Sequence, residues 1–205
     1  MNKKDRDETV RRYEERLLKF GRSIKVMGWR NKAQQSLRFD VLAEVGRLQG
    51  RTVLDVGCGF GDLYPFLLKK GIRTQYTGYD LSPNLIKLAR EAYPQAQFAV
   101  RDILANSGGK KFDYVLSSGV FNHRISNNLK FTQAMIERMF DLAKVGVAVN
   151  MMTSYVDYQD GHLYYYSPEQ MFTFAQRLSR HVVVRQDYPL YEFTLYIYRK
   201  TGKKS

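Results

Sequence analysis

The sequence predicts an α/β protein with a mostly parallel β-sheet and helices on both faces. The first observation is alternation, because from residue 52 onward short apolar runs alternate with longer amphipathic segments. The second is composition: 205 residues with 44% hydrophobic and 26% charged side chains suit one globular domain. The third is continuity, since no internal repeat and no Pro/Gly-rich linker divides the chain. We therefore expect one structural unit.

The first fifty residues predict an N-terminal helical cap or extension, residues 1–50, before the main domain, residues 51–205. Over residues 7–21, charged side chains occupy one face and apolar side chains recur near helical spacing. A second helix is expected over residues 31–48, with Asn31 as its N-cap.

The alternating region predicts strands and helices in a regular order. The strands are expected at 52–56, 75–80, 96–102, 112–118, 145–152, 181–188 and 193–199. The helices are expected at 61–71, 82–93, 128–144 and 167–179. Two of these helices begin with Ser followed by Pro, which suits Ser as N-cap and Pro at the first helical position. Ligands of such sheets bind beyond the carboxyl ends of the strands, so the site is expected there.

The net charge of +13 is concentrated at the two ends of the chain. Residues 1–51 carry 14 Lys/Arg against 7 Asp/Glu, and residues 199–205 add four more basic side chains. A basic extension attracts nucleic acid or an anionic substrate. The alternative is a solvated helix face with a frayed tail, and charge alone does not decide between them.

Cysteine content and hydropathy limit the class of protein. The single cysteine, Cys58, excludes an internal disulfide framework and a cysteine-based zinc cluster, and no metal site is expected. No apolar run approaches the roughly 20 residues that span a bilayer, and the N-terminus is too charged for a signal peptide. We expect a cytoplasmic protein without a membrane segment.

The stretch VLDVGCGFGDL places Gly57, Gly59 and Gly61 directly after a predicted strand that ends near Asp55. A dinucleotide-binding turn needs its third glycine one position later, where this chain has Asp62. A carboxylate at a helix start repels a pyrophosphate, which argues against NAD. The turn favours a ligand with a cationic, amino-acid-like end, whose ammonium group Asp55 can balance.

The next three strand ends also carry polar groups. Asp80 follows Gly61 at the offset where an acidic residue takes ribose hydroxyls, and a carboxylate suits a vicinal diol. The third strand offers Asp102 as an acceptor for an adenine amino group, and the fourth ends in a small polar turn. The candidate residues at these strand ends are Asp80, Leu81, Asp102, Ile103, Ser118 and Gly119.

These motifs together, in this order, resemble the class I S-adenosylmethionine-dependent methyltransferases over roughly residues 50–200. The matching segments are VLDVGCGFGDL, YTGYDLS, VRDIL and FDYVLSSGVFN. The resemblance implies a Rossmann-like, seven-stranded sheet with an antiparallel last strand. It also implies S-adenosyl-L-methionine as cofactor and S-adenosyl-L-homocysteine as product. By this analogy Gly57, Gly59 and Asp80 line the cofactor, and Asp102 sits by the adenine.

The extension offers three further residues that could reach the cofactor mouth, Trp29, Gln35 and Arg38. In many such enzymes the segment before the glycine turn covers the cofactor. Arg38 could pair with the methionyl carboxylate, which is a strong use of a guanidinium group. The alternative is that its helix packs Leu37 and Phe39 on the sheet and leaves Arg38 in solvent.

Residues 155–166 hold five tyrosines and follow the fifth strand, on the edge where acceptors sit in this superfamily. Tyrosines there could sandwich a flat acceptor, with His123 or His162 as the proton acceptor. Tyr155, His123 and His162 are therefore the candidate catalytic residues. The alternative is that these tyrosines belong to an edge strand and to the surface.

Missing motifs narrow the choice of methyl acceptor. The fourth strand end reads SSGVFNHR and lacks the [DNS]PP[YFW] sequence of enzymes that methylate exocyclic amines of DNA bases. We expect methyl transfer to O or N of a small molecule, aromatic or polar. The alternatives are an RNA methyltransferase that uses the basic N-terminus, and a non-catalytic cofactor-binding interaction module. The sequence leaves the oligomeric state open.

Overall fold

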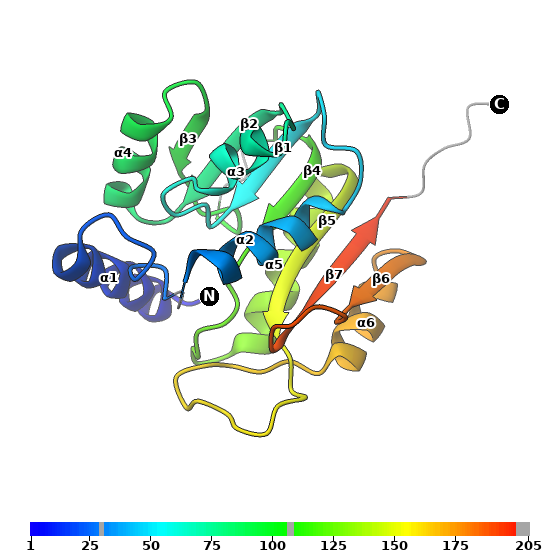
Figure 1. Ribbon diagram of the computed structural model, residues 1–205. Helices are drawn as coiled ribbons and strands as arrows, with labels where there is room; N and C mark the ends of the chain where they lie inside the picture. Colours follow the sequence, from blue (N-terminus) through cyan, green and yellow to red (C-terminus); the bar gives the residue numbers. More distant parts are fainter. Residues whose placement is uncertain (29–30, 106–108, 200–205) are drawn as a thin grey trace.

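Seven strands form a single sheet in the computed structural model, which describes residues 1–28, 31–105 and 109–199. Their order across the sheet is β3-β2-β1-β4-β5-β7-β6 (Figure 1). The strands are β1 (Thr52–Val56), β2 (Gln75–Asp80), β3 (Gln97–Val100), β4 (Phe112–Ser117), β5 (Ala143–Met152), β6 (His181–Arg185) and β7 (Glu192–Tyr198). Each of them falls within or overlaps a predicted range.

The strand directions agree with the sequence-based expectation. β1 pairs in parallel with β2 and β4, β2 pairs in parallel with β3, and β4 with β5. β7 lies between β5 and β6 and runs antiparallel to both. The predicted mostly parallel sheet with an antiparallel last strand is confirmed. The carboxyl ends of β1 to β5 therefore meet at one edge of the sheet.

Helices cover both faces of the sheet and bury two apolar layers. The helices α2 (Lys32–Ala43), α3 (Leu63–Lys69) and α4 (Pro83–Ala92) cover one face, and α5 (Asn128–Leu142) and α6 (Pro168–Gln176) cover the other. Successive strand residues point to opposite faces, so Val53 packs in the first layer and Leu54 in the second. Burial of each such side chain contributes about 1.5–3 kcal/mol.

Polar side chains begin three of these helices at the expected positions. The Asn31 side chain accepts a hydrogen bond from the Gln34 N–H at 2.9 Å. Ser82 Oγ accepts the Leu85 N–H at 3.1 Å, and Ser167 Oγ accepts the Gln170 N–H at the same distance. These caps satisfy N–H groups that have no partner within the helix, so the predicted helix starts are confirmed.

The second helix, α2, is shorter than its apolar pattern predicts. It ends at Ala43, although the pattern continues to residue 48. The cause is Gly46, whose φ of +153° departs from helical geometry. A Cβ atom at Gly46 would lie 2.5 Å from the Tyr114 hydroxyl, so the chain passes directly against β4 here. The apolar residues beyond Ala43 therefore pack on the sheet from a turn.

The first helix, α1 (Lys3–Phe20), begins earlier than residue 7 because the Asn2 side chain caps it, accepting the Asp5 N–H at 2.8 Å. It lies beside the carboxyl edge of the parallel strands (Figure 1). Asp5 is buried and accepts a hydrogen bond from the Ser126 hydroxyl, and Arg16 Nε donates to the Val26 carbonyl at 2.9 Å.

Throughout the described part of the chain, no helix is long and apolar enough to cross a membrane.

Candidate active site

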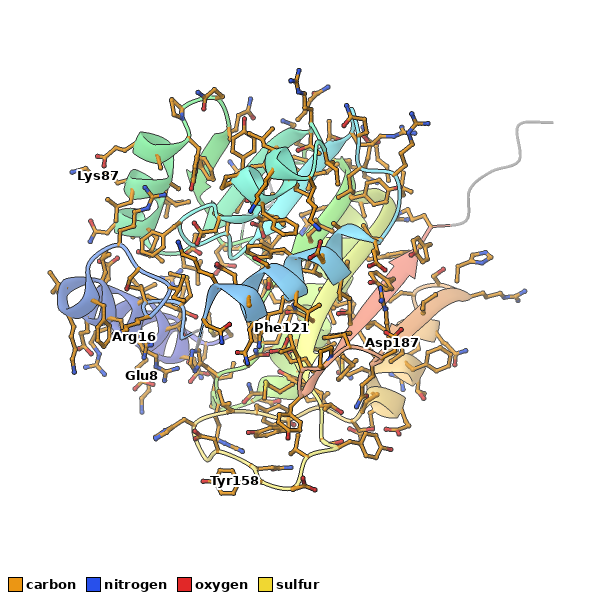
Figure 2. The ribbon with its side chains drawn as sticks, viewed as in Figure 1. Glu8, Arg16, Lys87, Phe121, Tyr158 and Asp187 are labelled. Carbon is orange, nitrogen blue, oxygen red and sulfur yellow. The ribbon has the colours of Figure 1, made fainter. Side chains whose placement is uncertain are left out.

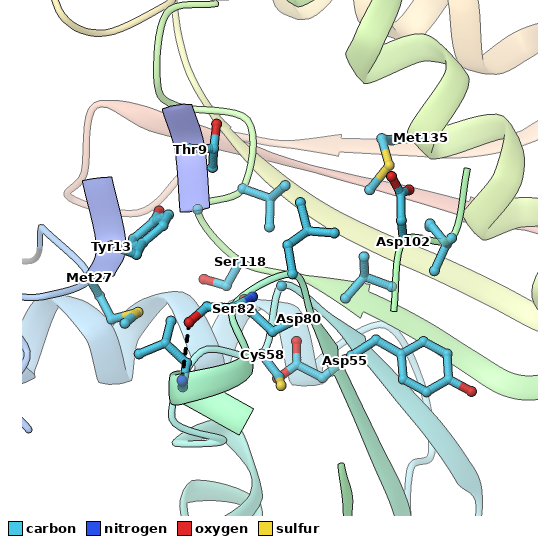
Figure 3. A pocket seen from close by; sticks show the side chains of 18 of the residues that line it. Thr9, Tyr13, Met27, Asp55, Cys58, Asp80, Ser82, Asp102, Ser118 and Met135 are labelled. Carbon is cyan, nitrogen blue, oxygen red and sulfur yellow. Dashed lines mark hydrogen bonds between the residues drawn. The ribbon is translucent and has the colours of Figure 1, made fainter. Parts of the chain in front are cut away.

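One pocket lies at the carboxyl ends of β1 to β4, with α1 across it (Figure 3). Figure 3 shows Thr9 and Tyr13 of α1 on one side, Asp102 and Met135 on the other, and Asp80 between them. The pocket lies here because parallel strands present their carboxyl ends, and the loops that follow them, at one edge of the sheet. The predicted cofactor-binding residues that line this pocket are Asp55, Gly57, Asp80, Leu81, Asp102, Ile103, Ser118 and Gly119, and the predicted catalytic residue His123 lines it as well.

The glycine turn after β1 adopts positive φ angles of +74° at Gly57, +54° at Gly59 and +75° at Gly61, which favour glycine. Only Gly57 of the three lines the pocket. A Cβ atom at Gly59 would lie 2.7 Å from Met27 Sδ, and one at Gly61 would lie 2.6 Å from the Phe98 ring. A Cβ atom at Gly57 would clash with Val120 Cγ2, so close packing of the protein itself favours glycine at all three positions. This cause was not predicted from the sequence.

Asp80, at the end of β2, is held by backbone groups from two loops. Its Oδ2 accepts the Gly59 N–H and its Oδ1 accepts the Ser82 N–H, each at 2.9 Å. Burial raises the pKa of Asp80, and these hydrogen bonds oppose that rise. Gly59 thus contributes to the site through its N–H. The fixed carboxylate keeps acceptor lone pairs for a ligand diol.

Asp55 is a second buried carboxyl group in the pocket. Its Oδ2 accepts the Tyr76 hydroxyl at 2.6 Å. Burial raises the pKa of Asp55 to about 7, and the charges of Asp80 and Asp62 add to the rise. Asp62 also lines the pocket and accepts a hydrogen bond from Gln35 Nε2 at 3.2 Å. This end of the pocket is acidic and favours a cationic ligand.

The ends of β3 and β4 complete the pocket floor. Asp102 Oδ1 accepts the Leu104 N–H at 2.9 Å, which fixes the turn after β3. Buried Asn150, on β5, accepts the Gly119 N–H at 2.9 Å and donates to Ser118 Oγ at 3.3 Å. Asn150 thus holds the Ser118–Gly119 turn from behind.

His123 and Tyr13 meet at the α1 side of the pocket. Their ring centroids are 6.2 Å apart, and the rings lie edge to face at 72°. Burial, with the nearby Arg12 and Arg16 guanidinium groups, lowers the pKa of His123 to about 4. Burial and the charge of Asp80 raise the pKa of Tyr13 to about 12. Both side chains are therefore neutral near pH 7, and this end of the pocket differs in charge from the acidic end.

The contribution of α1 to the pocket was not predicted from the sequence. Thr9, Val10 and Tyr13 line the pocket from this helix. Val10 and Tyr13 belong to the apolar face that the periodicity identified, and Thr9 is the polar residue on that face. The signal available in the sequence was Thr9, a hydroxyl residue on the otherwise apolar face of a charged helix.

The other two predicted catalytic residues lie outside the pocket lining. Tyr155 is 61% exposed, and its hydroxyl donates to the Glu169 carboxylate. His162 is exposed on the same loop, and its backbone N–H donates to Asp160 Oδ1 at 2.8 Å. Tyr158 points outward at the edge of the molecule (Figure 2). The structure thus brings only His123 of the three candidates to the cofactor-side residues.

Arg38 does not line the pocket, contrary to its expected place at the cofactor mouth. Its Nε lies 2.9 Å from both carboxylate oxygens of Glu192, and its Nη2 lies 2.7 Å from Oε1. Both side chains are buried between α2 and the start of β7. Gln35 of the same helix does line the pocket, as expected, together with Phe39. Trp29, the third candidate of this segment, lies outside the described residues.

The comparisons with known proteins agree with this geometry. The sequence model of a methyltransferase domain family matches residues 53–146. A protein of Mycobacterium tuberculosis that is named as a methyltransferase is 34% identical over 156 residues, which is 71% of this chain and 92% of that protein. The chain belongs to the class I S-adenosylmethionine-dependent methyltransferases.

Solved structures show the same fold as this methyltransferase. The magnesium protoporphyrin IX methyltransferase of Synechocystis PCC 6803, with bound S-adenosylhomocysteine, superposes with a TM-score of 0.69 at 20% identity, covering 94% of this chain and 99% of that one. The DhpI complex with S-adenosylhomocysteine gives 0.71 at 16% identity, covering 99% of this chain and 100% of that one. The methyltransferase uses S-adenosylmethionine as its cofactor.

Proposed function

We propose that this methyltransferase transfers a methyl group to an oxygen or nitrogen atom of a small polar or aromatic molecule. The observation that carries the proposal is the position of α1, which places Thr9, Val10 and Tyr13 in the lining of the pocket. The helix is attached on both sides of the pocket, through Asp5 to Ser126 and through Glu14 to Ser82. An acceptor enclosed beneath this helix has to be small.

The strand-end residues suit the cofactor. In the proposal, Asp80 holds the ribose hydroxyls and Asp102 the adenine amino group, with Leu81 and Ile103 beside the adenine ring. Asp55, with a pKa of about 7, balances the ammonium group of the methionine end. Support comes from the chemistry of the donor set, because buried carboxylates favour a ligand that carries a sulfonium and an ammonium charge.

At the other end of the pocket, His123 is the proposed proton acceptor. S-adenosylmethionine supplies a methyl group on a sulfonium, and orientation of the nucleophile is the main contribution of the protein. A hydroxyl acceptor also has to lose a proton, and the neutral imidazole of His123 is the proposed proton acceptor. Its pKa of about 4 makes it a weak base, so it takes the proton only as methyl transfer makes that proton acidic. The Tyr13 hydroxyl can donate a hydrogen bond to the same acceptor.

The charge pattern of α1 weighs against the RNA alternative. Its sequence carries 7 Lys/Arg and 5 Asp/Glu, a net charge of only +2. Arg11 pairs with Glu15 at 3.8 Å, and Arg6 with Asp7 at 3.6 Å. A helix that tracks phosphates is expected to carry a strong excess of cations, so the near balance of charges on α1 favours the solvated-face interpretation.

The test offers methyl-labelled S-adenosylmethionine, the purified protein and two fractions of a cell extract. One fraction is total RNA, and the other contains the low-molecular-weight metabolites. We expect label in a metabolite at both low and high salt. Label that enters RNA and is lost at high salt would overturn the proposal. Label in neither fraction would support the non-catalytic module.

Two matched variants make this test specific for the pocket. His123→Asn should reduce methyl transfer by about 100-fold or more, because it removes the proton acceptor. His181→Asn removes an exposed histidine of the edge strand β6, outside the pocket lining, and should leave transfer unchanged. Equal activity of the His123→Asn variant would reject His123 as the proton acceptor.

A further inference from the structure

We propose that Glu14 of α1 is a positioning residue for the cofactor, acting through Ser82 and Asp80. This inference rests on the proposed placement of the cofactor ribose at Asp80. It assigns to the N-terminal helix a second role besides covering the acceptor: it fixes the loop that carries the ribose-binding carboxylate.

The contacts form a chain from α1 to the cofactor site. Glu14 Oε1 accepts the Ser82 hydroxyl at 2.5 Å, and Glu14 Oε2 accepts a hydrogen bond from the Asn84 side-chain amide. Ser82 is 1% exposed, and its N–H donates to Asp80 Oδ1. A carboxylate from the N-terminal helix therefore holds both the residue that orients Asp80 and the first turn of α4.

Ser82 is restrained from three directions. Its Oγ accepts the Leu85 N–H at 3.1 Å while it donates to Glu14, and its N–H points to Asp80. Loss of the Glu14 contact leaves the buried Ser82 hydroxyl without its acceptor, and the hydroxyl then has to turn or draw in water. Either change disturbs the loop between Asp80 and α4.

The neighbours of Glu14 distinguish its role from that of an ordinary surface charge. Glu15 points to solvent and pairs with Arg11, with side chains that are 68% and 70% exposed. Tyr13, on the other side, lines the pocket. One turn of α1 thus contacts the pocket and the Asp80 loop together. A ligand that touches Tyr13 and Asp80 stabilises the docked helix, and by linkage the docked helix strengthens ligand binding.

The test measures the dissociation constants of S-adenosylmethionine and S-adenosylhomocysteine by calorimetry on the full chain. Glu14→Ala should weaken both about tenfold, because the Asp80 loop loses its outer support. Glu14→Gln keeps an acceptor oxygen for Ser82 and should recover most of the affinity. Glu15→Ala makes the same change of charge one residue away and should bind like the unmodified protein.

A second variant guards against misfolding of the first. Asn84 is exposed on α4, so Asn84→Ala removes half of the Glu14 contact without opening the core. It should weaken cofactor binding severalfold. The inference is overturned if Glu14→Ala and Asn84→Ala both bind with unchanged affinity while Asp80→Ala does not. If Asp80→Ala also binds normally, the placement of the cofactor itself is wrong.

Discussion

Buried ionisable side chains give the two ends of the pocket different charges. Asp55 and Asp80 sit at one end, where burial raises the pKa of both carboxyl groups. His123 and Tyr13 sit at the other, where burial keeps an imidazole and a phenol neutral. A cationic cofactor and an uncharged reacting group on the acceptor are the ligands that this distribution suits.

The raised pKa of Asp55 predicts that cofactor affinity depends on pH. Its pKa of about 7 means that the carboxylate forms only as the pH rises through neutrality. A cofactor with a sulfonium and an ammonium group binds the ionised form better, so affinity for S-adenosylmethionine should rise about tenfold between about pH 6 and 8. Calorimetry at three pH values measures this, with Asp55→Asn as the control. An equally steep rise in that variant would assign the effect to another group.

The same pKa has the opposite effect on the stability of the cofactor-free protein. The folded-state pKa lies above the ordinary value of 3.8, so the folded form holds a proton that the unfolded form releases. The contribution of Asp55 to stability is complete below about pH 4 and is lost as the pH rises through 7. Cofactor binding therefore improves over the pH range in which the free protein becomes less stable.

At the scale of elements, α2 carries Arg38, whose preference for a carboxylate was predicted correctly and whose partner was not. Arg38 has the right chemistry for a carboxylate, and it does bind one. Its partner is Glu192, at the start of β7, which lies 154 positions later in the chain. Spacing within α2 contains no information about this partner, because the sheet order decides which side chains meet.

We predict that breaking the Arg38–Glu192 ion pair lowers the free energy of unfolding and leaves cofactor binding intact. Arg38→Ala leaves a buried carboxylate without its partner and should lower the free energy of unfolding by about 3–5 kcal/mol. Replacing both residues, Arg38→Met with Glu192→Leu, removes both charges and should cost much less. Urea unfolding measures both variants. The double variant should still bind S-adenosylmethionine. If a stable double variant lost this binding, the result would assign Arg38 to the cofactor site.

The starts of α4 and α6 were predicted correctly because the sequence shows both a capping residue and a proline at each of them. Ser82 and Ser167 each precede Pro, and both cap their helices as expected. The end of α2 could not be read from its apolar pattern, because the stop at Ala43 comes from the close approach of Gly46 to Tyr114 on β4. That contact joins segments far apart in the sequence.

At the scale of the whole molecule, the strand-end residues of the site were predictable from the sequence, and the residues of α1 were not. Asp55 and Asp80 lie at the ends of β1 and β2, and Asp102 lies just after β3; parallel pairing brings these strand ends together whatever lies between them. The residues of α1 were missed because Thr9 marks a polar position on an apolar helix face, but nothing in residues 1–20 indicates where that face docks. Tyr13 and Glu14 acquire their roles only once α1 lies across the sheet edge.

The central claim is that S-adenosylmethionine binds at the carboxyl ends of these strands with Asp80 on its ribose. Calorimetric titration of the unmodified protein, Asp80→Ala and Asp113→Ala tests it most directly. Asp113 accepts hydrogen bonds from Thr52 at the opposite end of the sheet, which makes it a matched control. We predict at least about a tenfold loss of affinity for Asp80→Ala, from two charge-assisted hydrogen bonds, and none for Asp113→Ala. Unchanged affinity in Asp80→Ala would contradict the account.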